Sequence, residues 1–121
     1  AKTHIANGAD TLTGSSQSVV GSIGAAKDKG GILWFGTQSD QASLAPNAVV
    51  ASQIYDWTVV LTDLLAKIKT GKLGGDKYTL HLSNDGLKIA YNSGYSLPAD
   101  AKAAGDAAIA GIKSGSIKVN P

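Results

Sequence analysis

A chain of 121 residues, of which 43% are hydrophobic and 17% charged, is long enough for one domain and too apolar to be disordered. Its eleven lysines and nine acidic residues give a net charge of +2; the lysines are dispersed and arginine is absent, which argues against nucleic-acid binding. Absent cysteines exclude disulfides and thiolate metal sites, and no apolar run approaches the roughly 18 residues of a membrane span.

The chain begins with what we predict to be the last turns of a helix, Lys2–Asn7, ended by Gly8. A short strand, Thr11–Thr13, follows. The apolar spacing in Gln17–Lys27 predicts an amphipathic helix. Because the sequence contains no methionine, we expect a processed or partial chain of a larger precursor; a native product, a proteolytic fragment and a partial sequence all stay open.

The middle of the chain predicts two strands and the clearest helix. Ile32–Thr37 and Ala48–Gln53 are short apolar runs without alternation, which is typical of strands covered on both faces. Tyr55–Lys69 has apolar residues at helical spacing and lysines at its C-terminal end. Alternating strands and helices predict parallel units, with the two predicted helices as crossovers.

The last third predicts two strands, Tyr78–Leu82 and Leu87–Tyr91, with a hairpin turn at Ser83–Gly86. An alanine-rich helix, from about Pro98 to Ser114, ends the pattern. The expected fold class is therefore α/β, a mostly parallel sheet flanked by helices, with residues 1–121 forming a single lobe.

Three polar loops follow the first three predicted strands, where ligands bind in open α/β sheets. Their hydroxyl, amide, carboxylate and aromatic groups predict one site for a small polar ligand. The candidate binding residues are Ser15, Ser16, Gln17, Thr37, Gln38, Asp40, Tyr55, Asp56 and Trp57.

Each candidate also has a purely structural interpretation. Ser15 and Ser16 could serve only as helix caps, and Asp40 could brace its own loop. Trp57 lies on the apolar face of its predicted helix, so a place in the core competes with ligand stacking.

A catalytic or metal site is not expected. Gly14-Ser15-Ser16-Gln17-Ser18 lacks the second glycine of a nucleophile elbow. His4 and His81 are predicted to lie away from the three loops, and two distant histidines give no metal-ligand spacing. We therefore expect neither an enzyme nor a bound cofactor.

Several motifs occur in the order found in one family of receptors. They are Gly8-Ala9-Asp10, Ala25-Ala26-Lys27, the run from Trp34 to Gln41, Leu44-Ala45-Pro46, Val50-Ala51-Ser52, and the segment from Gly111 to Val119. In combination they resemble the second, C-terminal lobe of basic membrane protein solute receptors, which serve ABC importers.

The resemblance implies a type I periplasmic-binding-protein fold and a purine nucleoside-like solute held between two lobes. It further implies an exported chain, periplasmic or at the cell surface, lipid-anchored in the full-length precursor, with an ABC permease as partner. Gln38 occupies the position where many members of the family carry an acidic residue. It would therefore accept hydrogen bonds from ligand hydroxyls through an uncharged amide oxygen. The missing first lobe or another copy of the chain would complete the cleft. An extracellular structural or self-assembling protein built on this lobe is the alternative.

Overall fold

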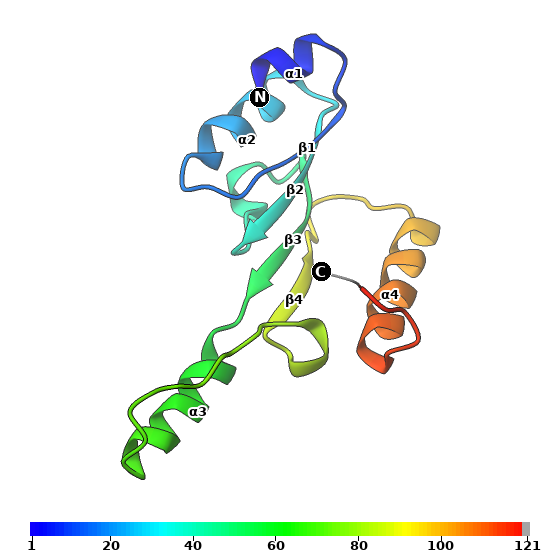
Figure 1. Cartoon of the computed structure of the whole chain (residues 1–121). Coiled ribbons are helices and arrows are strands. Elements are labelled where there is room, and N and C mark those ends of the chain that lie inside the picture. Colours follow the sequence, from blue (N-terminus) through cyan, green and yellow to red (C-terminus); the bar gives the residue numbers. More distant parts are fainter. Residues whose placement is uncertain (120–121) are drawn as a thin grey trace. The chain divides into compact units, whose positions relative to one another are not determined.

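The computed structural model describes residues 1–119. Its packing divides the chain into two compact units: residues Ala1–Ile54 with Ile89–Pro98, and residues Tyr55–Lys88 with Ala99–Pro121. Figure 1 shows the elements in chain order. The helices are α1 (Lys2–Ala6), α2 (Val19–Lys29), η1 (Ala42–Leu44), α3 (Thr58–Lys69), η2 (Leu82–Asn84) and α4 (Ala99–Ser114); the strands are β1 (Thr11–Thr13), β2 (Leu33–Gln38), β3 (Val49–Tyr55) and β4 (Leu87–Tyr91).

The four strands form one sheet in the order β1-β2-β3-β4. β1 and β2 pair in parallel with Leu12 opposite Trp34, and β2 and β3 pair in parallel with Thr37 opposite Gln53. The predicted fold class is confirmed, since this is a small α/β domain with a mostly parallel sheet flanked by helices. No helix within residues 1–119 has the length and apolar character needed to cross a membrane.

The fourth strand runs against the third. At one end the Asn92 amide donates to the Val50 carbonyl at 3.0 Å, and at the other the Asp56 amide donates to the Gly86 carbonyl at 2.9 Å. A late residue of one strand therefore meets an early residue of the other, which is antiparallel pairing. Our expectation that the helix after β3 is a parallel crossover is wrong, whereas α2 does join two parallel strands.

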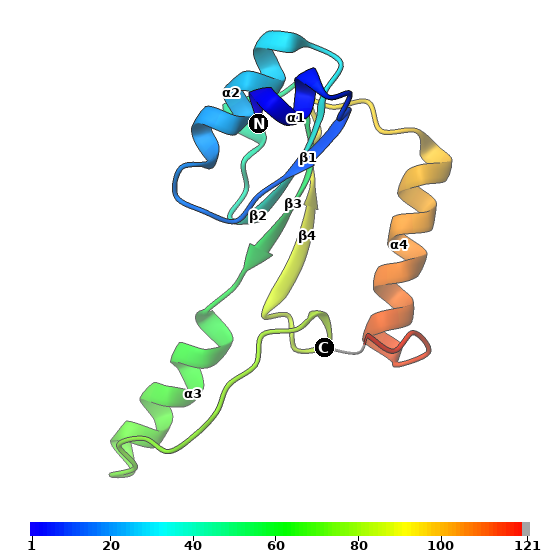
Figure 2. The ribbon, with the colours of Figure 1, turned by 45° about the horizontal axis from the view of Figure 1, so that its top comes forward.

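The core of the first unit lies between α2 and the sheet, and Figure 2 shows α2 beside β1 and β2. Trp34 and Ile23 are 1% exposed and Val49 is fully buried. An apolar side chain of this size contributes about 1.5–3 kcal/mol on burial. Phe35 is 40% exposed, so β2 is covered on one face only, contrary to the expectation drawn from its unbroken apolar run.

Asn92 holds the segment after β4 against the start of β3. Its side-chain amide donates to the carbonyls of Pro46 at 2.7 Å and Val49 at 2.6 Å, and its oxygen accepts the Gly94 amide at 2.8 Å. Only 9% of the residue is exposed, and these bonds satisfy its buried polar atoms. The first unit is thus closed by residues more than 40 positions apart in sequence.

The second unit differs most from expectation. No residue of α3 is buried, although its apolar spacing led us to expect a face packed in a core. Residues 78–81 form no strand; η2 follows, and the side-chain oxygen of Asn84 accepts the His81 amide at 3.0 Å. His81 is therefore the N-terminal cap of a short helix rather than a strand residue, and η2 packs against α4.

Candidate functional site

The carboxyl ends of β1 and β2 are joined by two hydrogen bonds. The Thr37 hydroxyl donates to the Gly14 carbonyl at 2.6 Å, and the Gln38 side-chain amide donates to the Ser15 hydroxyl at 3.0 Å. Ser15 and Gln38 are exposed and Thr37 is half-buried. The structure therefore brings together three of the predicted site residues from two loops that are 23 positions apart.

Gln38 has a left-handed backbone with a φ of 73°. Outside glycine such a conformation is uncommon, and it costs free energy that the surrounding structure must supply. It occurs at the last residue of β2, where the sheet edge opens to solvent. Strained residues of this kind concentrate at ligand-binding and active sites, so the backbone of Gln38 is a second, independent feature of this edge.

The loop after β2 is held from beneath by Gln41, a residue that our sequence interpretation did not select. Its side-chain oxygen accepts the Trp34 indole N–H at 2.7 Å, and its side-chain amide donates to the Thr37 carbonyl at 2.9 Å. Its backbone amide donates to the buried Ser52 hydroxyl at 3.1 Å. Gln41 is 6% exposed, so this network fixes the position of residues 37–41.

Gly36 makes room for that network. A Cβ atom at this position would lie 2.5 Å from the Ser52 hydroxyl oxygen and 2.9 Å from the Gln41 side-chain oxygen. Both distances are shorter than side chains tolerate. A glycine is thus required by close approach, and the residue is one that sequence inspection alone does not separate from the other glycines of the chain.

Ser16 and Asp40 have local partners. The Ser16 hydroxyl accepts the Ser18 amide at 3.2 Å and bonds with the Ser18 hydroxyl at 2.8 Å, just before α2 begins. Asp40 accepts the Ala42 amide at 2.9 Å at the start of η1. Asp40 thus has the bracing role that the sequence also allowed, whereas Ser16 bonds to Ser18, the residue before α2, and caps no helix amide. Gln17, in the same loop as Ser16, is exposed. A ligand-binding role for Ser16, Gln17 and Asp40 stays a prediction.

Tyr55, Asp56 and Trp57 belong to the second unit and are described within it. Asp56 accepts the Thr58 amide at 3.0 Å and forms an ion pair with Lys88 at 2.5 Å. The hydrogen bond from Lys88 has the largest effect on the Asp56 carboxyl, and together with the bonds from Thr58 it holds the pKa of that carboxyl far below its usual range. Trp57 is 56% exposed, so the alternative that it lies in the core is wrong, while its contact with a ligand stays a prediction.

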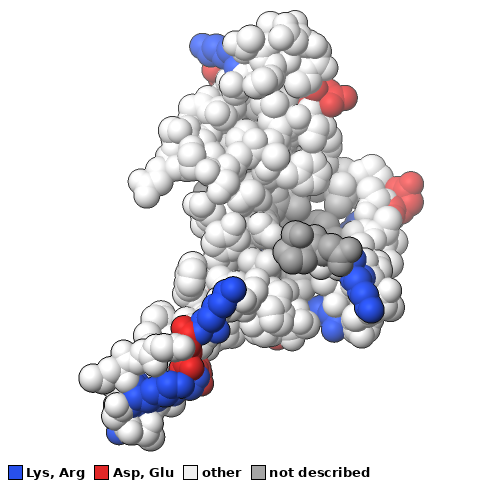
Figure 3. All heavy atoms as spheres, viewed as in Figure 1, with Lys and Arg blue, Asp and Glu red and all other residues white. Residues whose placement is uncertain are grey.

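A cluster of charges lies along α3. Lys67 pairs with Asp63 at 2.5 Å and with Asp76 at 3.1 Å, and the Tyr78 hydroxyl donates to Asp63 at 2.7 Å. Figure 3 shows acidic and basic groups side by side on this helix. Hydrogen bonds from Lys67 lower the pKa of Asp63, and hydrogen bonds to Asp63 and Asp76 raise the pKa of Lys67. Lys72 also pairs with Asp76 at 2.6 Å, so two lysines and two aspartates balance one another and the cluster is a poor site for a charged ligand.

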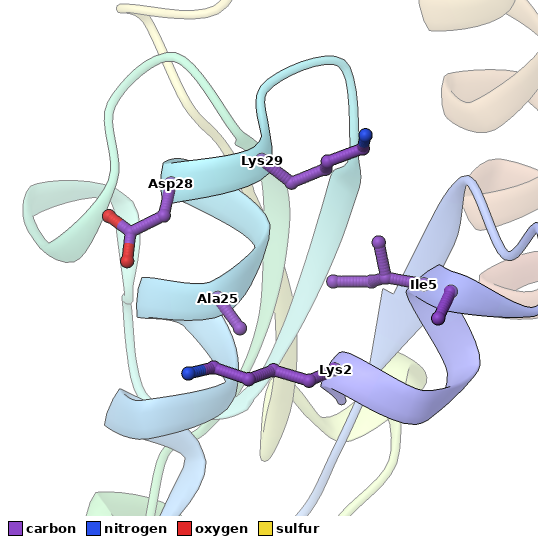
Figure 4. Close-up of a pocket in the computed structure, with 6 residues that line it drawn as sticks. Lys2, Ile5, Ala25, Asp28 and Lys29 are labelled. Atoms are coloured by element: carbon purple, nitrogen blue, oxygen red, sulfur yellow. The ribbon is translucent and has the colours of Figure 1, made fainter.

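A groove of about 490 Å³ lies between α1 and α2, in the first unit. Figure 4 shows its apolar wall, Ile5 and Ala25, and the ends of Lys2 and Lys29 pointing in opposite directions. Specific ligand sites place a few polar groups so that they converge. The polar ends here diverge, so the groove lacks the convergent polar groups found at the end of β2.

Neither histidine forms a recognisable catalytic arrangement. His81 Nδ1 lies 2.7 Å from the Ser83 hydroxyl in the exposed turn of η2, and His4 lies in α1. Within residues 1–119 no acidic side chain bonds to His81, and no three histidine or acidic residues gather as metal ligands. The described part of the chain therefore brings polar side chains together at the ends of β1 and β2 and shows no catalytic triad.

Comparison with known proteins gives the fold and not the family. No protein-family model matches the sequence, and no curated protein matches it significantly. Solved structures that match 98% of this chain include a transcriptional activator of the comK gene from Bacillus halodurans, with a TM-score of 0.80 and 16% identity, and an ABC transporter solute-binding protein from Conexibacter woesei, with a TM-score of 0.68 and 20% identity. The chain spans 42% and 40% of the lengths of those proteins.

Proposed function

We propose that this chain is a ligand-binding lobe of an exported solute-binding protein of an ABC importer, of the basic membrane protein type. Its ligand is a nucleoside-like or other small polar solute, bound without chemical change and without a cofactor. The fold shared with a solute-binding protein supports this proposal. Because the identity is only 20%, the shared fold does not indicate the solute or the subfamily, and both depend on the residues of the site.

The observation that carries the proposal is the pairing of Gln38 with Ser15 at the carboxyl edge of β1 and β2. Two exposed polar side chains meet at the edge where open α/β sheets bind ligands, and one of them has a strained backbone. The Gln38 amide and the Ser15 hydroxyl can both donate to and accept from solute hydroxyls. Ser16, Gln17, Thr37 and Asp40 would extend this edge. Ligand contacts of Tyr55, Asp56 and Trp57, which belong to the second unit, stay separate predictions.

The proposal also implies partners. Solute receptors close two lobes around the ligand, and the chain spans well under half of both matching structures. A first lobe of the receptor would supply the remaining contacts, and an ABC permease would accept the solute. We also propose an exported location, periplasmic or at the cell surface, with a lipid anchor in the full-length protein.

Titration of the isotope-labelled chain with adenosine, inosine and ribose, followed by NMR, tests the proposal. A lone lobe should bind weakly, and amide shifts should concentrate at residues 14–17 and 37–40. Gln38→Ala should weaken binding about 5- to 30-fold, corresponding to about 1–2 kcal/mol for one hydrogen-bonding partner. Asn47→Ala, in an exposed loop before β3, is the matched control and should leave affinity unchanged.

Two results would contradict this assignment. Shifts confined to the groove between α1 and α2 would place binding elsewhere. No saturable shift with any of these solutes, in the chain or in a receptor that contains both lobes, would exclude a nucleoside-like ligand.

A second candidate is an extracellular structural or self-assembling protein that uses the same lobe. The exposed apolar face of α3 favours it, because such faces commonly mark association surfaces. Both functions could use the fold, and the solute titration separates them.

A further inference from the structure

The dipeptide Asn7-Gly8 ends the first helix, α1. The Gly8 amide donates to the Ile5 carbonyl at 3.0 Å. The Ala9 amide donates to the His4 carbonyl, also at 3.0 Å. Gly8 has a left-handed backbone with a φ of 92°, and this conformation with these two bonds is the Schellman motif that ends many helices. Asn7 is therefore the last residue of the helix end, next to a glycine that the turn requires.

Asn7 differs from the other asparagines within residues 1–119. Its side chain is exposed and bonds to no other group of the described chain. The side-chain amides of Asn84 and Asn92 are hydrogen-bonded at both the oxygen and the nitrogen. Asn47 is exposed, but Ala48 follows it. Of these four residues only Asn7 combines an unbonded side chain with a following glycine.

Such a pair is the reactive one for deamidation. The backbone nitrogen of the glycine loses its proton to solvent base and attacks the side-chain carbonyl carbon of the asparagine, a cyclic imide closes, and the side-chain nitrogen leaves as ammonia. Glycine lacks the Cβ atom that hinders this approach in other residues. Water then opens the imide at the side-chain carbonyl to give aspartate, or at the backbone carbonyl to give isoaspartate, in which the backbone runs through the side chain.

We propose that Asn7 is a site of spontaneous covalent modification, in which its side chain cyclises onto the Gly8 nitrogen, releases ammonia and is hydrolysed to aspartate and isoaspartate, and that the isoaspartate form opens the end of α1.

The reaction requires the last turn of α1 to open. In the closed turn the Gly8 amide is bonded to the Ile5 carbonyl, and the backbone of Asn7, with φ −88° and ψ 11°, stays close to helical. A helical backbone does not direct the next nitrogen onto the side-chain carbon. Because α1 has five residues and none of them is buried, opening this turn costs little free energy. The rate of deamidation therefore follows the opening of the turn.

Isoaspartate prevents the turn from closing again. It adds one carbon to the backbone between residues 7 and 8, which moves the Gly8 and Ala9 amides away from their acceptors. It also places a carboxylate at the negative end of the helix dipole. α1 lies against α2, and Ile5 and Ala25 line the groove between them (Figure 4). Modification at Asn7 should therefore loosen α1 from α2 and leave the sheet unchanged.

Ageing of the whole 121-residue chain at mildly alkaline pH and physiological temperature, followed by tryptic digestion and mass spectrometry, tests the site. Trypsin cuts after lysine, so each of the four asparagines lies in a peptide of its own, and Asn7 lies in residues 3–27. Deamidation should be about tenfold faster at Asn7 than at Asn47, Asn84 or Asn92, since only Asn7 is both unbonded and followed by glycine. Fragmentation of the peptide should locate the product at residue 7, part of it as isoaspartate.

Three comparisons separate the role of the fold from that of the dipeptide. Unfolding in urea should accelerate deamidation far more at Asn92, which the fold protects, than at Asn7. Asn7→Gln keeps the amide but requires a larger ring, so it should abolish the reaction at this position. In the aged chain the Ala9 amide should lose its protection from hydrogen exchange. The Leu33 amide, which donates to the Asp10 carbonyl at 2.8 Å, should keep its protection.

Deamidation that is fastest at another of these asparagines, or a rate at Asn7 that unfolding raises as much as the rate at Asn92, would overturn the proposal. So would an aged chain that contains isoaspartate at residue 7 and still protects the Ala9 amide. Solute binding at Gln38 enters none of these measurements, so this proposal and the proposed function fail separately.

Discussion

The indole N–H of Trp34 donates to the side-chain oxygen of Gln41 at 2.7 Å, inside the first unit and directly beneath the loop that carries Gln38. Both residues are buried, so each satisfies the other's polar atom where water cannot. The bond links the core of the unit to the candidate binding edge. Core packing and loop position should therefore change together.

Gln41→Leu should lower the free energy of unfolding by about 1–3 kcal/mol. The substitution leaves the Trp34 N–H and the Thr37 carbonyl without their partner, which costs more than the hydrogen bonds themselves. Urea unfolding followed by tryptophan fluorescence measures the effect. Gln17→Leu, at an exposed position, is the control; equal stability of the two variants would show that the network contributes nothing.

Gly36→Ala should destabilise the chain by about 1–3 kcal/mol, because the new methyl group would lie 2.5 Å from the Ser52 oxygen. Gly21→Ala, in α2 with open space around the added atom, should instead stabilise it by about 0.5–1 kcal/mol. Thermal unfolding compares the two variants. A shift of the same sign in both would contradict the close approach at Gly36.

At position 38, glycine should be more stable than alanine by about 1 kcal/mol. Neither variant has the glutamine side chain, so the difference reports only the left-handed backbone. Both should lose the solute contact, and Gln38→Gly should unfold at a higher temperature than Gln38→Ala. Identical melting temperatures would mean that the backbone at this position relaxes freely.

Acid should destabilise the second unit. Lys88 lowers the pKa of Asp56, Lys67 that of Asp63, Lys72 that of Asp76, and Lys113 that of Asp85, from the usual 3.8. Groups whose pKa is lowered by folding contribute stability above the unfolded value, and this stability is lost as the pH falls through the folded values. Stability should therefore be constant from pH 7 to about 5 and decline below about pH 4.

Chemical denaturation between about pH 2 and about pH 7 checks this, with high salt as the control. Salt should flatten the decline, since these pairs are exposed and screened. A stability that rises as the pH falls below about 4 would contradict the ion-pair geometry.

Much of the fold follows from local pattern. The strands Thr11–Thr13 and Leu87–Tyr91 were predicted with the bounds that the structure has, and the helical spacing after Trp57 predicted α3. Residues Tyr78–Leu82 are predicted as a strand because they form one of the short apolar runs of the sequence. There the Asn84 side chain bonds the Thr79 carbonyl and the His81 amide, so a side chain takes the backbone groups that a strand would use.

The candidate site could be predicted only in part. The carboxyl-end rule selected Ser15, Thr37 and Gln38 from adjacent loops, and these do lie together. Gln41 could not be selected, because nothing in sequence separates a buried glutamine from the exposed one at position 38. Its importance depends on Trp34 and Ser52, seven and eleven positions away, whose approach only the folded chain defines.

The two units interleave along the chain, and this constrains the order in which they can form. Residues Ile89–Pro98 complete the first unit, and Asn92 ties them to Val49 and Pro46. During synthesis the ribosome must therefore release all of residues 55–88, which belong to the second unit, before the first can close. Folding that proceeds from the N-terminus should therefore pause while β3 lacks its neighbour β4. During this pause the unpaired edge of β3 can bind chaperones or other nascent chains.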